Sequence, residues 1–347
     1  MQKLRYGFPT VTGRGLIETI PEFVHQPFLI VTMEDLWPKI KPEIINAPHE
    51  VYFVQTTVQT ALERLVTELS DFSAIVGIGG GQALDVAKYL AWRKQMPLFQ
   101  FPTALTSNAV YGHRSGVRTN GKVVYRGWAT PECVFIDLEV ISQAPRQLNY
   151  SGIGDVLCFH TGVLDWKYAW KQGKCEAQWP FDIDLANQSL SKVQAVIDHA
   201  LDIKNLTPKG IEVLLDGLQW GTSFHGAGWN PRHIEGIDHF LFYILEQQTG
   251  RKFIHGQPVC LGIYIGALLH ENRSEEMLNT IRTVGLDIRP TAMDITWDDV
   301  ANALFGLKTY IKNAGLWHSI ASDVTITDTF ITSVRETVED AYLGFKE

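Results

Sequence analysis

Cysteine is scarce in this chain, and its scarcity excludes sulfur-based frameworks. The 347 residues include four cysteines, which form no CxxC pair and lie far apart, at Cys133, Cys158, Cys175 and Cys260. Neither a disulfide framework nor a thiolate zinc site is therefore expected. The sequence also lacks a run of about 20 apolar residues, the length that crosses a bilayer, and residues 1–9 contain no apolar signal-peptide core. We therefore expect a cytoplasmic protein without membrane insertion.

Positive charge is not in excess either. The 30 Lys and Arg residues face 38 Asp and Glu residues, which gives a net charge of -8, and the cationic residues form no dense stripe. Nucleic acid is not an expected partner, because its phosphate backbone needs such a stripe. Single hydrophobic cores stop growing at about 250–300 residues, so the length predicts two domains.

The first half of the chain has the rhythm of a parallel α/β fold. Short apolar runs separated by helix-length segments occur at 28–32, 51–54, 74–78 and 98–101, and a further run at 133–136. They lack strict alternation of apolar and polar residues, which indicates strands covered on both faces. We therefore predict an α/β domain with a parallel sheet over residues 1–148.

The second half has helical spacing and almost no strand-like runs. The helical segments are at 184–200, 208–223, 237–246 and 297–313. Thr207 before Pro208, and Thr296 with Asp299, have the pattern of helix N-termini. We predict an all-helical domain over residues 149–347.

Three adjacent glycines, Gly79, Gly80 and Gly81, follow the apolar run at 74–78 and precede a helix-forming segment. Glycines allow the backbone to approach a pyrophosphate, and the N–H groups at the start of the following helix favour an anion. The pattern is neither GxGxxG, because Gln82 stands where the third glycine is required, nor a P-loop. A tight structural turn is the alternative. We predict that the three glycines bind the pyrophosphate of a dinucleotide.

A set of motifs runs in unbroken order from about residue 74 to 265. They are Gly79-Gly80-Gly81-x-x-x-Asp85-x-x-Lys88, Pro102-Thr103 with Ser107, Gly152-x-Gly154-Asp155 followed by Asp165-Trp166, Gly236-x-Asp238-His239, and His255-Gly256. This set resembles the glycerol-1-phosphate dehydrogenases. They belong to the wider superfamily of iron-type alcohol dehydrogenases, glycerol dehydrogenases and dehydroquinate synthases.

The resemblance implies a dehydroquinate synthase-like layout. Residues 1–148 would be a Rossmann-like, dinucleotide-binding α/β domain, residues 149–347 a helical metal-binding and substrate domain, and a catalytic metal would lie in the cleft between them. In this family an Asp and two His hold the metal, and they correspond to Asp155, His239 and His255. A carboxylate and two imidazoles suit catalytic Zn²⁺. Two structural alternatives stay open, because Asp155 could be only a helix N-cap and His239 only a hydrogen-bonded histidine on an apolar helix.

The resemblance also implies the cofactor contacts. The expected cofactor is NAD or NADP, bound at the three glycines, with Thr103 and Ser107 at its phosphate or nicotinamide side. Asp85 and Lys88 would brace the first helix turn or the ligand. The segment 55–57 carries neither the ribose-binding acid nor an adjacent arginine, so the choice between NAD and NADP stays open.

Several positions depart from the relatives. Phe159 stands where iron-type alcohol dehydrogenases have a further histidine ligand, which favours a three-ligand zinc site, and Cys158 stands where the cyclases have a lysine. Asn108 replaces part of an acidic turn, and Glu235 replaces a small residue, whereas Arg232 is retained. We predict that Asn108 and Arg232 contact the substrate, and we expect the same reaction type on a substrate that is open to change.

A phosphorylated substrate would need local cations. The candidates are Arg114, Arg118, Lys122 and Arg232, since guanidinium groups match phosphate oxygens. The alternative is that Arg118, Lys122 and Arg126 decorate a solvated hairpin around Asn120-Gly121. His113 and His225 are candidate proton relays, with a structural role as the alternative.

Together these features predict a metal-dependent, NAD(P)-linked oxidoreductase acting on a small polyol or polyol phosphate, with sn-glycerol-1-phosphate and dihydroxyacetone phosphate as the best match. One alternative is a sugar-phosphate cyclase or lyase that uses NAD transiently. Another is a catalytically silent binding protein that keeps the fold. No general base is evident, and a homo-oligomer is left open.

Overall fold

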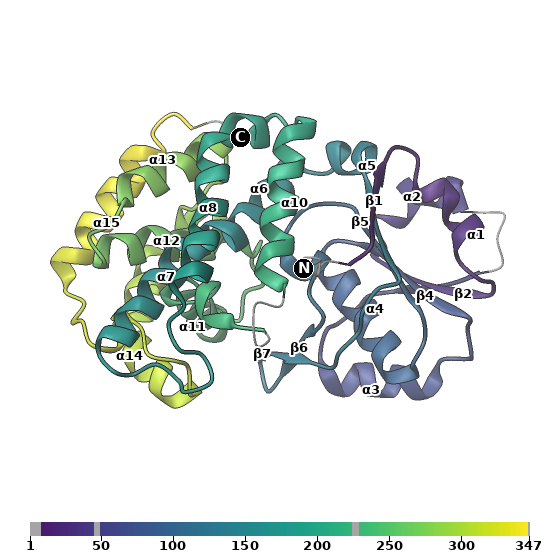
Figure 1. Cartoon of the computed structure of the whole chain (residues 1–347), viewed down its shortest axis with the longest axis horizontal. Helices are drawn as coiled ribbons and strands as arrows, with labels where there is room; N and C mark the ends of the chain where they lie inside the picture. Colours follow the sequence, from purple (N-terminus) through teal and green to yellow (C-terminus); the bar gives the residue numbers. More distant parts are fainter. Residues whose placement is uncertain (1–7, 45–48, 224–228, 346–347) are drawn as a thin grey trace. The chain divides into compact units, whose positions relative to one another are not determined.

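The computed structural model describes residues 8–44, 49–223 and 229–345. The chain divides into two compact units, residues 1–149 and residues 150–347, and we describe each by itself. Figure 1 labels most of the helices and strands of both units.

The first unit is built on a six-stranded parallel sheet with the order β1-β8-β5-β4-β2-β3. The strands are β1 (Thr10–Gly13), β2 (Phe28–Thr32), β3 (His49–Phe53), β4 (Ala74–Gly79), β5 (Leu98–Pro102) and β8 (Cys133–Asp137). The five apolar runs identified in the sequence correspond to β2, β3, β4, β5 and β8. Strand β1 was not predicted, because this four-residue strand at the sheet edge is polar and mostly exposed.

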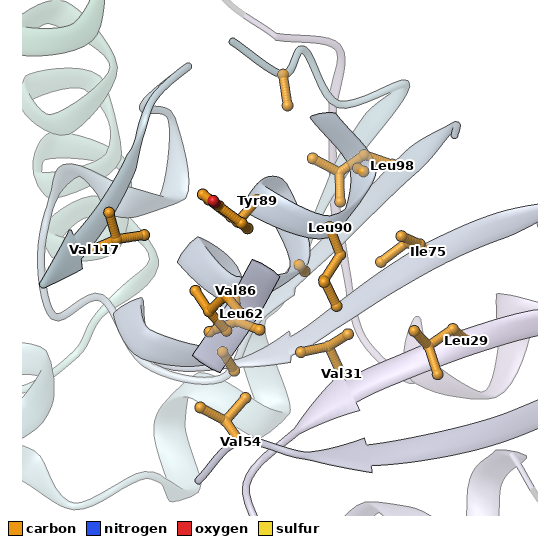
Figure 2. Packing of buried hydrophobic residues seen from close by; sticks show 14 residues of the cluster. Leu29, Val31, Val54, Leu62, Ile75, Val86, Tyr89, Leu90, Leu98 and Val117 are labelled. Atoms are coloured by element: carbon orange, nitrogen blue, oxygen red, sulfur yellow. The ribbon is translucent and has the colours of Figure 1, made fainter. Parts of the chain in front are cut away.

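Helices cover both faces of this sheet. On one face, α3 (Gln59–Glu68) and α4 (Gly81–Lys94) pack on a cluster that includes Leu29, Val31 and Ile75 (Figure 2). On the other face, α1 (Ile20–Phe23) and α2 (Trp37–Ile44) contribute to a second cluster with the alternate residues of the same strands. Successive strand residues point to opposite faces, so apolar residues at every position bury both.

The strand order places a topological switch point between β2 and β4. The chain leaves β2 for β3 on one side and returns to pair β4 on the other side of β2. Connections that diverge in this way leave a crevice at the carboxyl ends of the two strands, where ligands of open α/β sheets bind. The glycine turn directly follows β4.

A two-stranded hairpin and two short helices complete the first unit. Strands β6 (Ser115–Thr119) and β7 (Lys122–Arg126) are antiparallel, and Asn120 and Gly121 between them have φ values of 52° and 75°. Positive φ at both turn residues is the geometry of a type I′ hairpin, so the hairpin predicted from the sequence is confirmed. Helices α5 (Leu138–Gln143) and α6 (Arg146–Tyr150) follow β8.

Every regular element among the described residues of the second unit is a helix. Its helices are α7 (Gly154–Lys171), α8 (Ile183–Asp198), α9 (Ala200–Lys204), α10 (Pro208–Thr222), α11 (Ile237–Thr249), α12 (Gly256–Leu269), α13 (Ser274–Val284), α14 (Trp297–Ala314) and α15 (Asp328–Ala341). The Thr207 side chain caps α10, and Thr296 and Asp299 form a capping box at α14, as the sequence predicted. No helix in the described part of the chain is long and apolar enough to span a membrane.

Candidate metal centre and dinucleotide turn

Asp155, His239 and His255 lie together in the second unit. Each offers one ligand atom, and these atoms lie within 4.8 Å of one another. Asp155 Oδ1 is 2.9 Å from His255 Nε2 and 3.4 Å from His239 Nε2. Asp155 belongs to the first turn of α7, His239 is the third residue of α11, and His255 is the N-cap of α12. The structure thus brings together three residues that lie up to 100 positions apart in the sequence.

The close approach of α7 to α12 explains how Asp155 meets His255. A Cβ atom built on Gly154 would lie 2.9 Å from the Cα atom of Gly256, so the two helix starts touch at a pair of glycines. The Ser151 hydroxyl also accepts a hydrogen bond of 2.9 Å from the Gly256 N–H group. The N-cap of α7 is Ile153, not Asp155, so the N-cap alternative for Asp155 is wrong.

His239 is held in a defined orientation by its neighbour Asp238. Asp238 Oδ1 lies 2.5 Å from His239 Nδ1, and Asp238 Oδ2 accepts a hydrogen bond of 2.6 Å from the Thr161 hydroxyl. A carboxylate on Nδ1 fixes the proton there and leaves Nε2, which faces Asp155, as the ligand atom. His239 is therefore a buried, hydrogen-bonded histidine, as the alternative held, and it still presents a ligand atom to the trio.

The electrostatics of the trio suit a cation. Burial by itself would raise the pKa of Asp155, but His255 and His239 outweigh it and hold that pKa well below its usual range. Burial lowers the pKa of His239, yet hydrogen bonds to Asp155 and Asp238 raise it well above the usual value. One carboxylate oxygen and two imidazole nitrogens form the donor set of a three-ligand catalytic zinc site, so the residues present fit a divalent metal.

Two nearby sulfur atoms do not belong to this donor set. Cys158 forms a second possible cluster with Asp238 and His239, but its thiol donates to the Ile234 carbonyl oxygen at 3.0 Å. Burial raises the pKa values of Cys158 and Cys260 well above the usual range. Only the thiolate form is a good metal ligand.

Glu235 adds a further carboxyl group beside the trio. Its Oε1 accepts a hydrogen bond of 2.6 Å from the Tyr243 hydroxyl, and the Tyr243 ring centroid lies 6.2 Å from that of His239. Burial raises the pKa of Glu235, whereas the charge of His239 lowers it. The sequence marked Glu235 only as a departure from the relatives, and the structure adds Tyr243 as its partner.

The glycine turn in the first unit has the geometry of an anion site. Gly79 has φ of +152°, and a Cβ atom built on it would lie 2.8 Å from the Ala83 Cβ atom, so only glycine fits there. Gly80 is the N-cap of α4, and a Cβ atom on it would meet only the Thr106 side chain, at 4.0 Å. The backbone is therefore approachable at Gly80, and the first N–H groups of α4 follow it.

The segment after β5 folds over this turn. The Thr103 N–H group donates to the Gly79 carbonyl oxygen at 3.1 Å, and a Cβ atom on Gly81 would lie 3.3 Å from Ser107 Oγ. Asn108 follows Ser107 as the first residue of a 3-10 helix, Asn108–Val110. The structure therefore gathers the three glycines, Thr103 and Ser107 at one place in the first unit.

Asp85 and Lys88 act within the fold. Lys88 is 0% exposed, and its Nζ forms an ion pair of 2.8 Å with Asp85 Oδ1. The same Nζ donates to the carbonyl oxygens of Ala109, Gly112 and Arg114, each at 3.1 Å. Burial raises the pKa of Asp85 while Lys88 lowers it. Of the two roles considered for this pair, these contacts favour bracing of the helix and of the segment 109–114.

Comparison with known proteins adds the family to this geometry. Residues 37–145 match the family model described as iron-containing alcohol dehydrogenase. A glycerol-1-phosphate dehydrogenase (NAD(P)+) of Aeropyrum pernix is 30% identical over 252 residues, which cover 72% of this chain and 69% of that protein. The chain belongs to the glycerol-1-phosphate dehydrogenase family. The resemblance noted in the sequence is thereby confirmed.

Solved structures support the fold of this family member. A probable glycerol dehydrogenase from Sinorhizobium meliloti superposes with a TM-score of 0.70 at 19% identity, covering 98% of this chain and 99% of that one. ValA, a 2-epi-5-epi-valiolone synthase from Streptomyces hygroscopicus solved with NAD+ and Zn2+ bound, superposes with a TM-score of 0.66 at 14% identity, covering 96% and 97%. The predicted dehydroquinate synthase-like fold class is confirmed.

Arg232, which is shared with the family motif, lies in the interior of the second unit. It is 0% exposed, and its guanidinium group donates to the His318 carbonyl oxygen at 3.0 Å and lies 3.4 Å from a Glu176 carboxylate oxygen. A guanidinium group enclosed in this way offers no surface to a phosphate. The structure thus supports a structural role for Arg232 in place of the predicted substrate contact.

The remaining cationic candidates lie on or near the hairpin of the first unit. Arg118 is half-buried and donates to the Thr57 hydroxyl at 2.8 Å, while Arg114, Lys122 and Arg126 are exposed. This placement favours the alternative in which the cations decorate the hairpin. Burial lowers the pKa of His113 to about 4, so its imidazole is neutral near pH 7. His225 lies outside the described residues.

Proposed function

We propose that this chain is a metal-dependent dehydrogenase that transfers hydride between NAD or NADP and a small polyol phosphate, with sn-glycerol-1-phosphate and dihydroxyacetone phosphate as the substrate pair. In the oxidative direction the alcohol carbon gives hydride to the nicotinamide and the hydroxyl loses a proton, which yields the ketone and NAD(P)H. The observation that carries this proposal is the meeting of Asp155, His239 and His255 from three helices in a member of this family.

The trio would hold the metal through one oxygen and two nitrogens, and the bound divalent ion, Zn²⁺ by its donor set, would polarise the substrate carbonyl. Asp238 keeps His239 in the tautomer that presents Nε2, and Thr161 holds Asp238 in turn. Such outer carboxylates orient ligands and are often as necessary to metal affinity as the ligands themselves.

The glycine turn would hold the dinucleotide. The N–H groups at the start of α4 and the positive end of the helix dipole favour the pyrophosphate, and Gly80 leaves room for it. The turn follows the strand that borders the switch point of the sheet, where dinucleotides bind in folds of this kind. Thr103 and Ser107 border the same place and would contact the cofactor.

The substrate choice rests on the family and on two departures. Asn108 stands in the turn after β5 where the relatives have an acidic turn, and it remains our candidate for a substrate contact. Glu235 stands beside the trio where the relatives have a small residue. Burial raises the pKa of this acid, but in its ionised form it would disfavour a dianionic substrate by charge repulsion. For this reason the test must include uncharged polyols and aldehydes beside the phosphorylated pair.

The test is a panel of polyols, polyol phosphates and aldehydes assayed by nicotinamide absorbance with both cofactors. We expect net NAD(P)H formation with sn-glycerol-1-phosphate and the reverse reaction with dihydroxyacetone phosphate. Product formation without net NAD(P)H would favour the cyclase alternative, for which ValA supplies a likeness of fold alone. Bound metal and cofactor without turnover on any substrate would favour a silent binding protein.

A further inference from the structure

Asp165 is a fully buried carboxylate that touches the helices carrying all three proposed metal ligands. It lies in α7, ten residues after Asp155, and is 0% exposed. At a rise of about 1.5 Å per residue it sits about 15 Å along the helix from Asp155, too far to be a ligand. We propose that Asp165 is a positioning residue that sets the geometry of the metal centre through α7, α11 and α12. This inference rests on the proposed metal site.

The first connection runs from α7 to the start of α11. Asp165 Oδ2 accepts a hydrogen bond of 2.8 Å from the N–H group of Ile237, the first residue of α11. The N-cap of α11 is Gly236, which has no side chain to cap the helix. Asp165 therefore supplies, from another helix, the acceptor and the negative charge that a helix start requires. His239 follows Ile237 by two residues, so this bond fixes the backbone that carries it.

Gly236 makes this connection sterically possible. A Cβ atom built on Gly236 would lie 2.5 Å from Asp165 Oδ2, closer than real side chains approach. Any larger residue at position 236 would therefore push the start of α11 away from α7. The close contact between α7 and α11 therefore needs both Gly236 and Asp165. Both residues belong to the motifs that carry the family resemblance.

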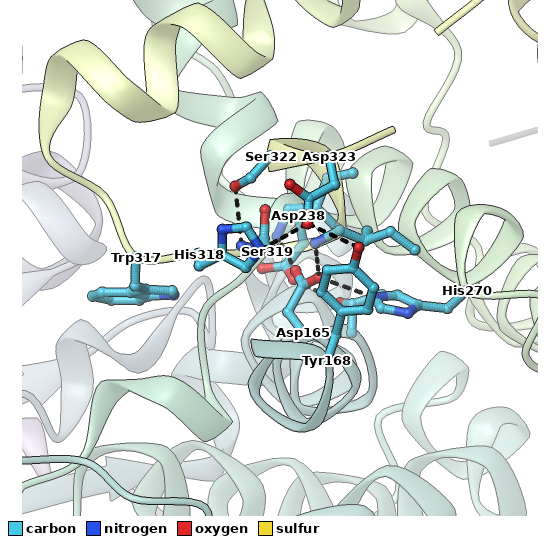
Figure 3. A network of polar contacts seen from close by, with 12 residues as sticks. Asp165, Tyr168, Asp238, His270, Trp317, His318, Ser319, Ser322 and Asp323 are labelled. Carbon is cyan, nitrogen blue, oxygen red and sulfur yellow. Dashed lines mark hydrogen bonds and ion pairs between the residues drawn. The ribbon is translucent and has the colours of Figure 1, made fainter. Parts of the chain in front are cut away.

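The second connection runs to the far end of α12. Asp165 Oδ1 lies 2.9 Å from Nε2 of His270, the residue that caps α12 at its C-terminus (Figure 3). The same helix begins at Gly256, directly after its N-cap His255, and is held there by the hydrogen bond from the Gly256 N–H group to the Ser151 hydroxyl. Hydrogen bonds thus hold this 14-residue helix at both ends. We infer that they fix the position of α12 relative to α7, and with it the position of His255 relative to Asp155.

A third contact and a nearby cation stabilise the buried charge. Asp165 Oδ1 also accepts a hydrogen bond of 2.8 Å from the N–H group of Ile320, and the guanidinium group of Arg232 lies 3.5 Å from the Asp165 carbonyl oxygen. A buried carboxylate is tolerated only when it is hydrogen-bonded and its charge is compensated. Arg232 is the nearby cation, since its charge interacts favourably with that of Asp165.

The test compares the metal affinity of Asp165→Asn with that of a matched control. Asp287→Asn also removes a buried carboxylate of the second unit, but among the described residues the Asp287 side chain bonds Arg289 and makes no hydrogen bond to α7, α11 or α12. Zn²⁺ affinity is measured by competition with a chelator, Co²⁺ coordination by the visible spectrum, and thermal stability of the metal-free protein alongside.

We expect Asp165→Asn to bind Zn²⁺ about 10–100-fold more weakly, the range seen when an outer partner of a metal ligand is removed. The Co²⁺ spectrum should change, and Asp287→Asn should keep both properties of the wild type even where its thermal stability falls equally. The inference would be overturned if Asp165→Asn had the same Zn²⁺ affinity and Co²⁺ spectrum as Asp287→Asn. A residue that only stabilises the fold would leave both properties unchanged.

A second variant covers the case in which Asp165→Asn does not fold. His270→Gln keeps a donor toward Asp165, whereas His270→Leu removes it, so the leucine variant should bind Zn²⁺ more weakly than the glutamine variant. Equal affinities of these two variants would also overturn the inference. A wild type that binds Zn²⁺ but turns over no substrate defeats the proposed function and leaves this inference standing, whereas a wild type that binds no metal overturns both.

Discussion

The glycine turn of the first unit and the ligand trio of the second unit are built in opposite ways. The turn consists of three consecutive residues and would bind its ligand through backbone N–H groups, so its requirement is the absence of side chains. The trio consists of three side chains from three helices, and its requirement is that distant elements keep their relative places. We therefore expect cofactor binding at the glycine turn to be weakened by substitutions that add a side chain. Metal binding at the trio should be weakened by substitutions that remove a charged or ligating side chain.

The largest expected effect is loss of the metal centre without loss of the cofactor site. Asp155→Ala removes the shared carboxylate of the trio and should lower kcat/KM by at least about a thousandfold, because a catalytic metal supplies several kcal/mol of transition-state stabilisation. Binding of NADH or NADPH, measured by fluorescence, should stay within about twofold of the wild type. His255→Ala should behave alike. An unchanged activity in these variants would be fatal to the metal mechanism.

Removal of the metal is the second test. A ligand present at about 100 times its Kd stabilises a folded protein by about 2.7 kcal/mol, so treatment with a chelator should lower the melting temperature of the wild type and added Zn²⁺ should restore it. Asp155→Ala should show no Zn²⁺-dependent shift, and Gly80→Ala should show the wild-type shift. A shift of equal size in Asp155→Ala would place the metal elsewhere.

The glycine turn offers a matched pair of smaller changes. Gly79→Ala forces a side chain into a φ of +152° and against Ala83, and it should cost about 1–3 kcal/mol of unfolding free energy. Gly80→Ala meets only Thr106 at 4.0 Å, so stability should change by less than about 1 kcal/mol, as is usual for surface changes. The Gly80 variant should nevertheless bind NAD(P)H about tenfold more weakly, about 1.4 kcal/mol, because its methyl group occupies the space proposed for the pyrophosphate. Unchanged cofactor affinity would support the structural-turn alternative.

The smallest effect concerns pH and the first unit alone. Burial, with a contribution from Lys88, lowers the pKa of His113 to about 4 from an ordinary value of 6.5. Below pH 6.5 the unfolded chain binds a proton that the folded chain refuses, so stability should fall as the pH drops from about 6.5 to about 4 and level off below. The loss should not exceed about 2 kcal/mol, because the imidazole is only half-buried. The measurement is the free energy of unfolding in urea as a function of pH. In the His113→Gln variant the loss of stability between pH 6.5 and pH 4 should vanish. If the wild type and the variant lose the same stability over this range, His113 is not its source.

The sequence could predict features whose residues lie close together along the chain. The caps at Thr207 and Thr296 were predictable because each involves residues three apart. Helices α7 and α12 were harder to recognise, since they are buried on nearly every side and show no amphipathic spacing. Both helices carry a ligand of the proposed metal.

The ligand trio itself could not come from spacing. The sequence places 84 positions between Asp155 and His239, and only the family resemblance joined them. The role of Asp165 was beyond sequence reasoning for a further reason, because its partners include the backbone N–H groups of Ile237 and Ile320, which any sequence possesses. Arg232 is the opposite case. The sequence retains it from the family motif, which led us to predict a substrate contact, but the structure buries its side chain.

The position of each ligand within its helix has an electrostatic consequence. Asp155 lies in the first turn of α7, His239 in the first turn of α11, and His255 at the N-cap of α12, so three helix starts meet at the trio. Each helix start carries about half a positive elementary charge from its peptide dipoles. These partial charges are fixed before any substrate arrives, and they need no reorganisation during reaction. They oppose the charge of a bound cation, which the carboxylates of Asp155 and Asp238 offset, and they would favour the negative charge that hydride delivery places on a carbonyl oxygen.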